Sequence, residues 1–319
     1  MISETWYNIC MDINRKNPDN WNADIQASVA FYNKWFVEFA PPAFQSSREQ
    51  SVVKVNDAIR KLNSLCDLDD GVLISNPTIL PVLRQMTCPP LASDRLAGLA
   101  YVKPSVVKSF EKGTVGERTT VKYASQIMDV IRDLLDVDLF AWIDGEKSPT
   151  EEQRRLAAFV ISDRLCGAMT DPLIRNEQER RQIRAITDFL NKKGYVKANP
   201  KTYKDLKPGE YAVHLNLTVR QGRREVKLPG DVSILPRSAK KGTVPLLIEA
   251  KSAGDFANVN KRRKEEAEKV RLLKQTYGNP RFVLFLGGYF DSGYLGFEAA
   301  EGIDWIWEHR VSDMEKLGL

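Results

Sequence analysis

Apolar residues recur at steps of three and four through the first half of the chain, a spacing that predicts amphipathic helices. Two stripes carry this pattern: Val52, Val55, Ile59 and Leu62, and then Ile127, Val130, Ile131, Leu134 and Leu135. Because proline cannot donate an intrahelical hydrogen bond, the pairs Pro41-Pro42 and Pro89-Pro90 are expected to break the helical segments.

Two more helices are expected in the middle of the chain. The first runs from about residue 150 to 169 and is opened by the cap-like sequence Ser148-Pro149-Thr150-Glu151. Asp171-Pro172 then precedes a charged helix over about residues 175–193, which Gly194 stops.

The apolar pattern changes to a period of two after Tyr195. Val213, Leu215, Leu217 and Val219 alternate with polar residues, which predicts a strand with one wet face. Two short strands (231–236 and 245–251), a helix (258–277) and a fully apolar strand (281–286) follow. The order predicts a mixed α/β fold, with a mainly helical region at residues 1–148 and a mixed sheet flanked by helices at residues 149–319.

The charge and the hydropathy of the chain indicate which kinds of partner it could meet. Residues 1–150 carry 16 Lys and Arg against 19 Asp and Glu, whereas residues 151–319 carry 31 against 23. The second half is therefore the part expected to meet a polyanion. The chain has no apolar run of about 18 residues and no signal-like N-terminus, so we expect a cytoplasmic protein without membrane contact.

Cysteine and histidine usage argues against zinc chemistry. The four cysteines, Cys10, Cys66, Cys88 and Cys166, are scattered, which favours free buried thiols over a metal site or a disulfide framework. The two histidines, His214 and His309, are too few for a histidine-based metal cluster, and we expect structural roles for both.

The residues with the clearest chemical pattern are Asp231 and the segment Glu249-Ala250-Lys251. Residues two apart on a strand share a face, so Glu249 and Lys251 should project together. If the strand of Asp231 pairs alongside, two carboxylates and the carbonyl of Ala250 could hold Mg²⁺. Lys251 beside that ion could orient or deprotonate a water, or stabilise charge on a phosphate.

Acid-x-Lys arises roughly three times by chance in a chain of this composition, and it occurs at Asp205-Leu-Lys207, Glu225-Val-Lys227 and Glu249-Ala-Lys251. Of the three, Glu249 ends an apolar strand and has an upstream acid on another strand. The alternative for Glu249 and Lys251 is a solvated ion pair at a strand end.

A basic run follows the motif at Lys261, Arg262, Arg263 and Lys264. These side chains could bind DNA phosphates, or they could belong to a surface helix balanced by Glu265, Glu266 and Glu268, with Glu265 paired to Lys269. Glu179 is a further candidate metal ligand or a salt-bridge residue. Trp305 and Trp307 are expected in the core.

At Asp231, Glu249 and Lys251 the sequence resembles the PD-(D/E)xK nucleases, with Gly230-Asp231 in place of Pro-Asp. It is more closely similar to the XamI-type restriction endonucleases in five segments: WNADIQASVAFYNKWFVEFA (21–40), RQMTCPPLASDRLAGL (84–99), DRLCGAMTDPLIRNEQERRQ (163–182), EAKSAGDFANVNKRRKEE (249–266) and residues 287–310.

The resemblance implies a restriction-endonuclease-like core and Mg²⁺-dependent hydrolysis of double-stranded DNA at a short palindrome, by a homodimer with a companion methyltransferase. Asp231, Glu249 and Lys251 would be the catalytic residues. The family is associated with the sequence GTCGAC, which these segments do not by themselves assign to this chain. Two alternatives stay open: another nuclease on the same core, for repair, junction resolution, nicking or phage defence, and a DNA-binding protein without catalysis.

Overall fold

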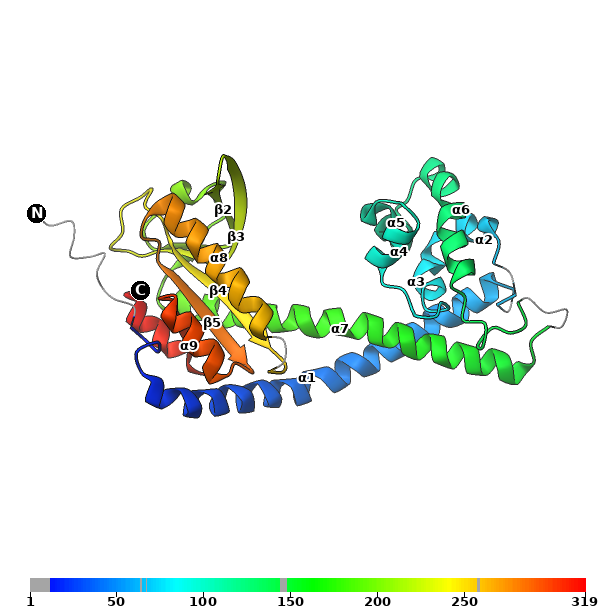
Figure 1. Ribbon diagram of the computed structural model, residues 1–319, viewed down its shortest axis with the longest axis horizontal. Helices are drawn as coiled ribbons and strands as arrows, with labels where there is room; N and C mark the ends of the chain where they lie inside the picture. The colour runs from blue at the N-terminus through cyan, green and yellow to red at the C-terminus, as the bar shows by residue number, and fades with distance from the viewer. Residues whose placement is uncertain (1–11, 64, 67, 144–147, 257–258) are drawn as a thin grey trace, which may run out of the picture. The chain divides into compact units, whose positions relative to one another are not determined.

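The computed structural model describes residues 12–63, 65–66, 68–143, 148–256 and 259–319, and only the backbone of residues 259–264. Within these ranges the chain forms two compact units (Figure 1). One unit comprises residues 1–38 and 175–319, and the other comprises residues 39–174. We describe each unit by itself.

The unit of residues 39–174 is helical. It contains the second part of α1 (Pro18–Lys61), the short elements α2 (Asp70–Ser75), η1 (Pro77–Ile79), α3 (Leu80–Leu83), α4 (Ser93–Leu99) and α5 (Pro104–Glu111), then α6 (Glu117–Asp133) and the first part of α7 (Glu151–Lys192). Both predicted apolar stripes contribute to its core, since Val55, Leu62, Ile127 and Ile131 have no exposed surface.

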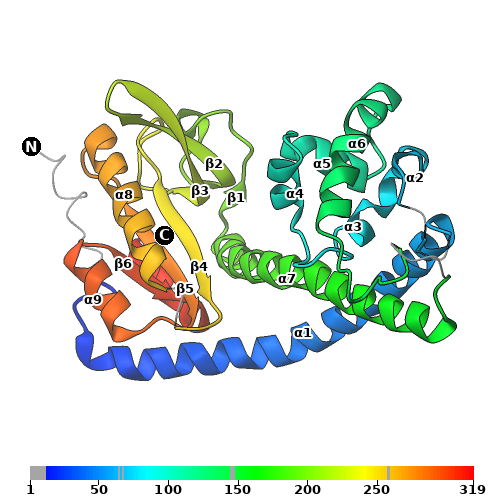
Figure 2. The same ribbon diagram turned by 45° about the vertical axis from the view of Figure 1, so that its right-hand side comes forward.

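The other unit is built on a six-stranded mixed sheet (Figure 2). The strands lie in sequence order: β1 (Val196–Lys197), β2 (Glu210–Gln221), β3 (Arg224–Leu235), β4 (Leu246–Ala253), β5 (Phe282–Gly288) and β6 (Asp304–Trp307). The pairs β2–β3 and β3–β4 are antiparallel, whereas β1–β2, β4–β5 and β5–β6 are parallel. The predicted mixed α/β class, with helices before a mixed sheet, is confirmed.

Helices cover both faces of this sheet. On one face, α8 (Val259–Tyr277), α9 (Ser292–Ala300) and the beginning of α1 pack against alternate strand residues, including Leu247, Leu284 and Trp305. On the other face, the end of α7 and the C-terminal helix η3 (Glu308–Leu317) pack against Ile248 and Phe285. This two-sided burial explains the near-continuous apolar run of β5. Trp305 and Trp307 are fully buried, so the prediction of a core role is confirmed.

Two predicted helix breaks are wrong. Pro41 and Pro42 lie inside α1, and Pro172 lies inside α7, which continues unbroken through both of the helices expected around it. A proline removes one intrahelical bond and bends the helix, but flanking turns can still propagate. All three prolines lie within four residues of the boundaries between the units, at 38/39 and 174/175. The cap at Thr150 is confirmed, because its side chain accepts from the Gln153 amide at 3.2 Å.

The structure also changes three predicted details of the sheet. β3 begins at Arg224 instead of residue 231 and forms a long hairpin with β2 through a turn at Gly222, which has φ of 61°. The strand β1 and the helix α9 were not expected. The element boundaries of α8 and β5 agree with the predicted ones to within two residues.

The compact units and the two regions expected from the sequence share their helical and sheet character but differ in their limits. Residues 1–38 cluster with the sheet, and residues 149–174 cluster with the helices. From the sequence we predict that residues 1–148 serve DNA recognition or dimerisation and that residues 149–319 form the catalytic domain, and both roles stay predictions.

Two remaining expectations concern membranes and thiols. None of the helices in the described part of the chain combines the length and the apolar character needed to cross a bilayer. The three described cysteines are thiols and not disulfides, as expected, but only Cys166 is buried, whereas Cys66 and Cys88 are exposed. Cys66 and Cys88 lie in loops, outside the regular helices, which explains why their side chains are exposed.

We expect Phe285→Ala to lower the free energy of unfolding of the sheet unit by about 3–5 kcal/mol, because it opens a cavity in a fully buried strand. Val196→Ala, at a side chain that is 63% exposed, is the control and should change it by under about 0.5 kcal/mol. Urea unfolding followed by tryptophan fluorescence measures this, since four of the five described tryptophans belong to this unit. Equal midpoints for the two variants would contradict the core assignment.

Candidate active site

Asp231 and Glu249 meet where the ladder between β3 and β4 ends. The last paired residues are Val232 and Ile248, so Asp231 and Glu249 are the next residues on the two strands. The backbone amide of Ala250 donates to the Asp231 carboxylate at 2.8 Å. The sheet therefore brings together the two carboxylates that the sequence predicted to converge.

Lys251 joins the same group through ion pairs. Its Nζ lies 3.1 Å from Glu249 Oε1 and 3.1 Å from Glu266 Oε1 on α8. Lys269, one turn further along α8, pairs with Glu249 through the other oxygen of that carboxylate. The result is an alternating chain of charges, Glu266–Lys251–Glu249–Lys269, between β4 and α8. The predicted pair of Glu265 and Lys269 is wrong, because Lys269 turns towards the sheet instead.

Burial makes these contacts important. The side chains of Glu249, Lys251 and Glu266 are 10%, 23% and 1% exposed. A buried charge without a partner is costly, so each of these groups depends on its neighbour of opposite sign. The alternative of a solvated ion pair at a strand end is therefore not what the structure shows.

The electrostatic environment separates the roles of the charged groups. Burial and the nearby Glu249 raise the pKa of Asp231, although the Ala250 amide and the two lysines oppose the shift. Burial works to lower the pKa of Lys251, but Glu249 and Glu266 outweigh it and the pKa is raised. Lys251 is therefore held as an ammonium ion, which suits a donor and a positive charge better than a base.

The three predicted catalytic residues line a pocket of about 330 Å³. Its other lining residues come from α7, β4 and α8: Arg175, Gln178, Glu179, Gln182, Ala250, Ser252 and Glu265. Two carboxylates at the edge of an open pocket form the oxygen-rich donor set that Mg²⁺ prefers. Lys269 neutralises the Glu249 carboxylate in this structure. A divalent cation bound by Asp231 and Glu249 would neutralise the same carboxylate, so the residues present fit such an ion.

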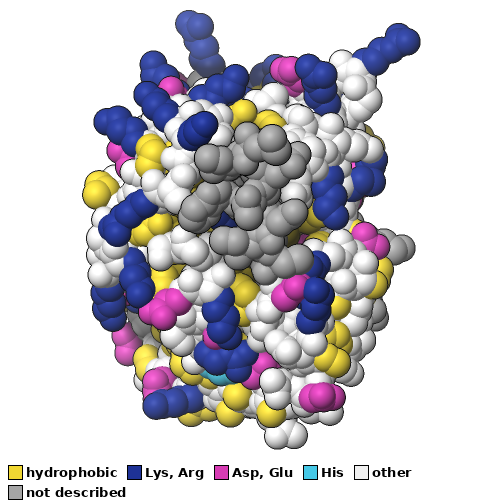
Figure 3. Space-filling view, turned by 90° about the vertical axis from the view of Figure 1, so that its left-hand side faces the viewer, with side chains coloured by type: hydrophobic (Ala, Val, Ile, Leu, Met, Phe, Trp, Pro, Cys, Tyr) yellow, Lys and Arg dark blue, Asp and Glu magenta, His cyan; other side chains and the backbone are white. Residues whose placement is uncertain are grey.

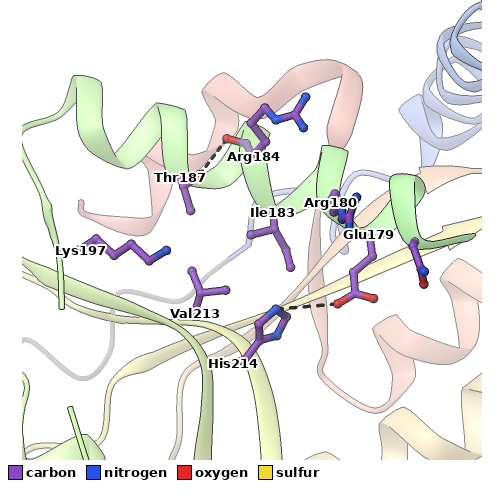
Figure 4. A pocket seen from close by; sticks show the side chains of 9 residues that line it. Glu179, Arg180, Ile183, Arg184, Thr187, Lys197, Val213 and His214 are labelled. Carbon is purple, nitrogen blue, oxygen red and sulfur yellow. Dashed lines mark hydrogen bonds and ion pairs between the residues drawn. The ribbon is translucent and has the colours of Figure 1, made fainter. Parts of the chain in front are cut away.

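Glu179 and His214 lie on the α7 side of Asp231. The three side chains offer ligand atoms within 4.8 Å of one another, and His214 Nε2 lies 4.0 Å from Glu179 Oε1 (Figure 4). Both side chains are more than half exposed. His214 faces Glu179 at a second pocket of about 490 Å³, and its expected structural role stays a prediction. Glu179 lies near Asp231, and its role as a metal ligand stays a prediction.

The four basic residues predicted to bind DNA fall outside the described side chains. Lys261, Arg262, Arg263 and Lys264 belong to the first turns of α8, of which the structure describes only the backbone. Figure 3 shows many Lys and Arg side chains spread over one face of the molecule, with acidic side chains among them. Phosphate binding by the four residues stays a prediction.

The sequence analysis missed three residues that support the site. One of the two alternatives left open placed Glu266 and Lys269 on a solvated helix face, yet both contact residues of the motif strand. Gln182 of α7 is buried and donates to the carbonyl oxygens of Lys251 and Phe285 at 3.0 and 3.2 Å. Spacing could have indicated the first two, because residues three apart share a helix face. No sequence signal indicates Gln182.

The family comparison agrees with this geometry. Residues 63–307 match the XamI restriction endonuclease family. The chain belongs to this family of type II restriction endonucleases, which are site-specific deoxyribonucleases, so the resemblance expected from the sequence is confirmed.

Two curated relatives carry the same kind of name. The chain is 42% identical over 314 residues to the type II restriction enzyme SalI of Streptomyces albus G, which covers 96% of this chain and 99% of the relative. It is 24% identical over 143 residues to the type II restriction enzyme XamI of Xanthomonas campestris pv. amaranthicola, which covers 45% and 50% of the two chains. Among solved structures, protein VC1899 from Vibrio cholerae covers 77% of this chain and 55% of its own, with 12% identity and a TM-score of 0.29, too low to support an argument.

We expect metal-free Asp231→Asn to be more stable than the parent at neutral pH. A raised carboxyl pKa means that the folded chain holds the proton more tightly than the unfolded chain. Ionisation therefore costs stability as the pH rises from the ordinary value of 3.8 through the folded value. The amide of asparagine removes this cost and can still accept from Ala250.

Thermal unfolding in EDTA from pH 3.5 to 8 measures this difference, which should be largest at pH 7–8 and vanish at the acid end. Glu225→Gln, at an exposed carboxylate on the far end of β3, is the control and should match the parent throughout. A variant less stable than the parent at pH 8 would show that ionisation of Asp231 does not lower the stability of the folded protein.

Proposed function

We propose that this protein is a type II restriction endonuclease that hydrolyses double-stranded DNA at a short palindrome, with Asp231, Glu249 and Lys251 as its catalytic residues. The observation that carries the proposal is the convergence of these side chains at the end of the β3–β4 ladder, in a chain 42% identical to a type II restriction enzyme. The protein would act in the cytoplasm, where the DNA lies.

Asp231 and Glu249 would hold Mg²⁺ with the carbonyl oxygen of Ala250. When bound, the ion supplies a Lewis acid that polarises a phosphate oxygen and lowers the pKa of a bound water. The amide of Ala250 fixes the Asp231 carboxylate at 2.8 Å, so this ligand is oriented before any metal arrives. Preorganisation of this kind reduces the cost of assembling the site.

Lys251 would act as a permanent positive charge. Its contacts with Glu249 and Glu266 keep it protonated, so it can donate to the attacking water or to a non-bridging phosphate oxygen. Charge develops on these oxygens in the transition state, and a donor that is already in place stabilises it without reorganisation.

Cleavage of both strands at a palindrome implies particular partners for this protein. A palindrome has two-fold symmetry and both strands must be cut, so we propose a homodimer with one site in each subunit. Lys261, Arg262, Arg263 and Lys264 at the start of α8 would bind backbone phosphates near the site. A methyltransferase that modifies the same sequence would protect the host DNA.

We expect Asp231→Ala, Glu249→Ala and Lys251→Ala each to lower the rate of DNA cleavage by at least about 1000-fold, since each removes a group that acts on the reacting phosphate. Digestion of plasmid DNA with Mg²⁺ or with EDTA measures this, and the parent should give discrete bands only with Mg²⁺.

The chain contains its own control, because Glu225 and Lys227 repeat the acid-x-Lys spacing on exposed positions of β3. Glu225→Ala and Lys227→Ala should cut within a few-fold of the parent rate. Parent-like cleavage by both Asp231→Ala and Lys251→Ala would refute the site, whereas smears or single nicks from the parent would refute site-specific cleavage of both strands.

Glu266 should act as a positioning residue for Lys251. We expect Glu266→Gln to lower the cleavage rate about 10- to 100-fold, because the ammonium loses one of its two partners and is less firmly placed. The fall in rate at high pH should also begin at a lower pH, since Glu266 is one cause of the raised pKa of Lys251.

Glu268→Gln is the matched control: Glu268 is two residues away on α8 and pairs with Arg271. It should keep the parent rate and pH profile. A merely structural role for Glu266 would change the melting temperature without moving the pH profile, so an unmoved profile would count against positioning.

A further inference from the structure

The helical unit contains two short helices that meet at a tight turn. α4 (Ser93–Leu99) is followed by the four residues 100–103 and then by α5 (Pro104–Glu111). The two helices lie side by side in both views of the chain (Figure 1 and Figure 2). A helix, a turn of three or four residues and a second helix are the parts of the helix-turn-helix motif, which binds DNA. None of the catalytic roles proposed above uses these residues.

Backbone hydrogen bonds fix the turn between the two helices. The amide of Val102 donates to the carbonyl of Ala97 at 3.0 Å, and the amide of Tyr101 donates to the carbonyl of Gly98 at 3.3 Å. Together with the left-handed conformation of Tyr101, at φ of 53°, these bonds form a Schellman motif. Glycine is the usual residue at this position, so the sequence gives no clear signal of the turn. Pro104 then occupies the first turn of α5, where proline suits a helix.

One side of the helix pair is anchored in the core of the helical unit. The anchoring side chains come from both helices and from the turn, and each is at most 9% exposed: Leu96, Ala97, Ala100, Val102, Val107 and Phe110. They belong to the same apolar cluster as the buried stripes of α1 and α6. Core packing therefore fixes the direction of α5, as a helix that recognises DNA requires.

The opposite side of α5 is exposed and polar. Ser105, Lys108 and Lys112 are three and four residues apart, so they share one face of the helix, and all three are exposed. Lys103, in the turn just before α5, is exposed as well. The face that points away from the core thus carries a hydroxyl group and ammonium groups, all of which can donate to bases or phosphates.

The charge of this segment differs from that of the sequence around it. Residues 93–123 carry six Lys and Arg against three Asp and Glu, whereas residues 1–150 as a whole carry 16 against 19. The segment is therefore a positive exception in a negative half of the chain. Clustered positive charge on one helix is typical of an element that binds a nucleic acid.

The carboxylates near α5 leave its basic face available. Glu111 pairs with Arg84 at 2.8 Å, and both side chains are largely buried. Lys108 pairs with Asp94 at 3.2 Å, but these side chains are 54% and 70% exposed. Exposed ion pairs are weak. Lys108 can therefore exchange Asp94 for a group on DNA.

We propose that α4 and α5 form a helix-turn-helix element that recognises double-stranded DNA, with α5 in the major groove. The major groove admits an α-helix, and base contacts come from the first turns of such a helix. Ser105 and Lys108 accordingly contact base edges, whereas Lys103 and Lys112, at the two ends of α5, bind phosphates. The inference rests on the proposed function, since it assigns the DNA recognition of that enzyme to residues 93–112. The competing explanation is a solvated helix pair that serves only the core of its unit.

Selection from a pool of random-sequence duplexes tests the proposal, with the full chain and with CaCl₂ in place of MgCl₂ to separate binding from cleavage. The parent should enrich one sequence. Lys108→Ala should bind the enriched duplex about 10- to 100-fold more weakly and accept other bases at one position. Ser105→Ala should relax a neighbouring position. Lys112→Ala should weaken binding to enriched and shuffled duplexes alike and lower the salt slope by about 1.

Arg60→Ala is the matched control. Arg60 of α1 lies in the same unit and forms an exposed ion pair with Asp57 at 3.2 Å, the separation found between Lys108 and Asp94. This variant should select the parent sequence with the parent affinity. The proposal would be overturned if Lys108→Ala and Ser105→Ala both did the same, or if the parent enriched no sequence.

Methylation of guanine N7 in the enriched duplex gives a second measurement, because N7 lies in the major groove. We expect methylated guanines to block binding by the parent, and the block at one guanine to be lost in Lys108→Ala. Arg60→Ala should keep every block of the parent. Identical patterns in the parent and Lys108→Ala would overturn the placement of α5 in the major groove.

The outcomes separate this inference from the proposed function. A parent that cuts DNA into discrete bands, while Lys108→Ala and Ser105→Ala keep its selected sequence, retains the nuclease assignment and loses the helix-turn-helix element. A parent that selects a sequence through α5 but cuts no DNA retains the element and loses the nuclease assignment.

Discussion

The candidate site depends on partnering charges that the fold buries. Glu249 and Lys251 lie inside β4, after three residues that belong to the core, and α8 covers the face on which both project. Without Glu266 and Lys269 on that helix, each would be a buried charge with incomplete compensation, a cost of several kcal/mol. The alternating chain from Glu266 to Lys269 removes this cost. The same contacts raise the pKa of Lys251 and keep it charged, as its proposed role beside the phosphate requires.

Asp231 meets a related constraint in a different way. It has no lysine in direct contact among the described residues, and it relies on one backbone amide at the end of the β3–β4 ladder. Its raised pKa reflects burial and the negative charge of Glu249. A site of this kind is incomplete without added positive charge. The structure thus stores some instability at the position where a cation is proposed to bind, as functional sites often do.

The sequence analysis succeeded where local patterns dominate. Alternation along residues 213–219 predicted β2, and the apolar run before Gly287 predicted β5. Same-face spacing placed Glu249 beside Lys251. It failed at Pro41 and Pro172, which lie inside long helices: a proline removes one intrahelical hydrogen bond, and the helical turns on both sides of it continue.

For this protein, the sequence by itself determined the periodic elements, the mixed α/β class and the identity of the acid and acid-x-Lys groups, because these depend on residues close together in the chain. Only the tertiary structure decided which groups meet. The strand pairing brings Asp231 to Glu249, and α8 presents Glu266 to Lys251 and Lys269 to Glu249. The positive φ of 54° at His214 accompanies an imidazole that faces Glu179. These contacts join residues up to about 50 positions apart, and their register is set by packing across the sheet, which no local pattern records.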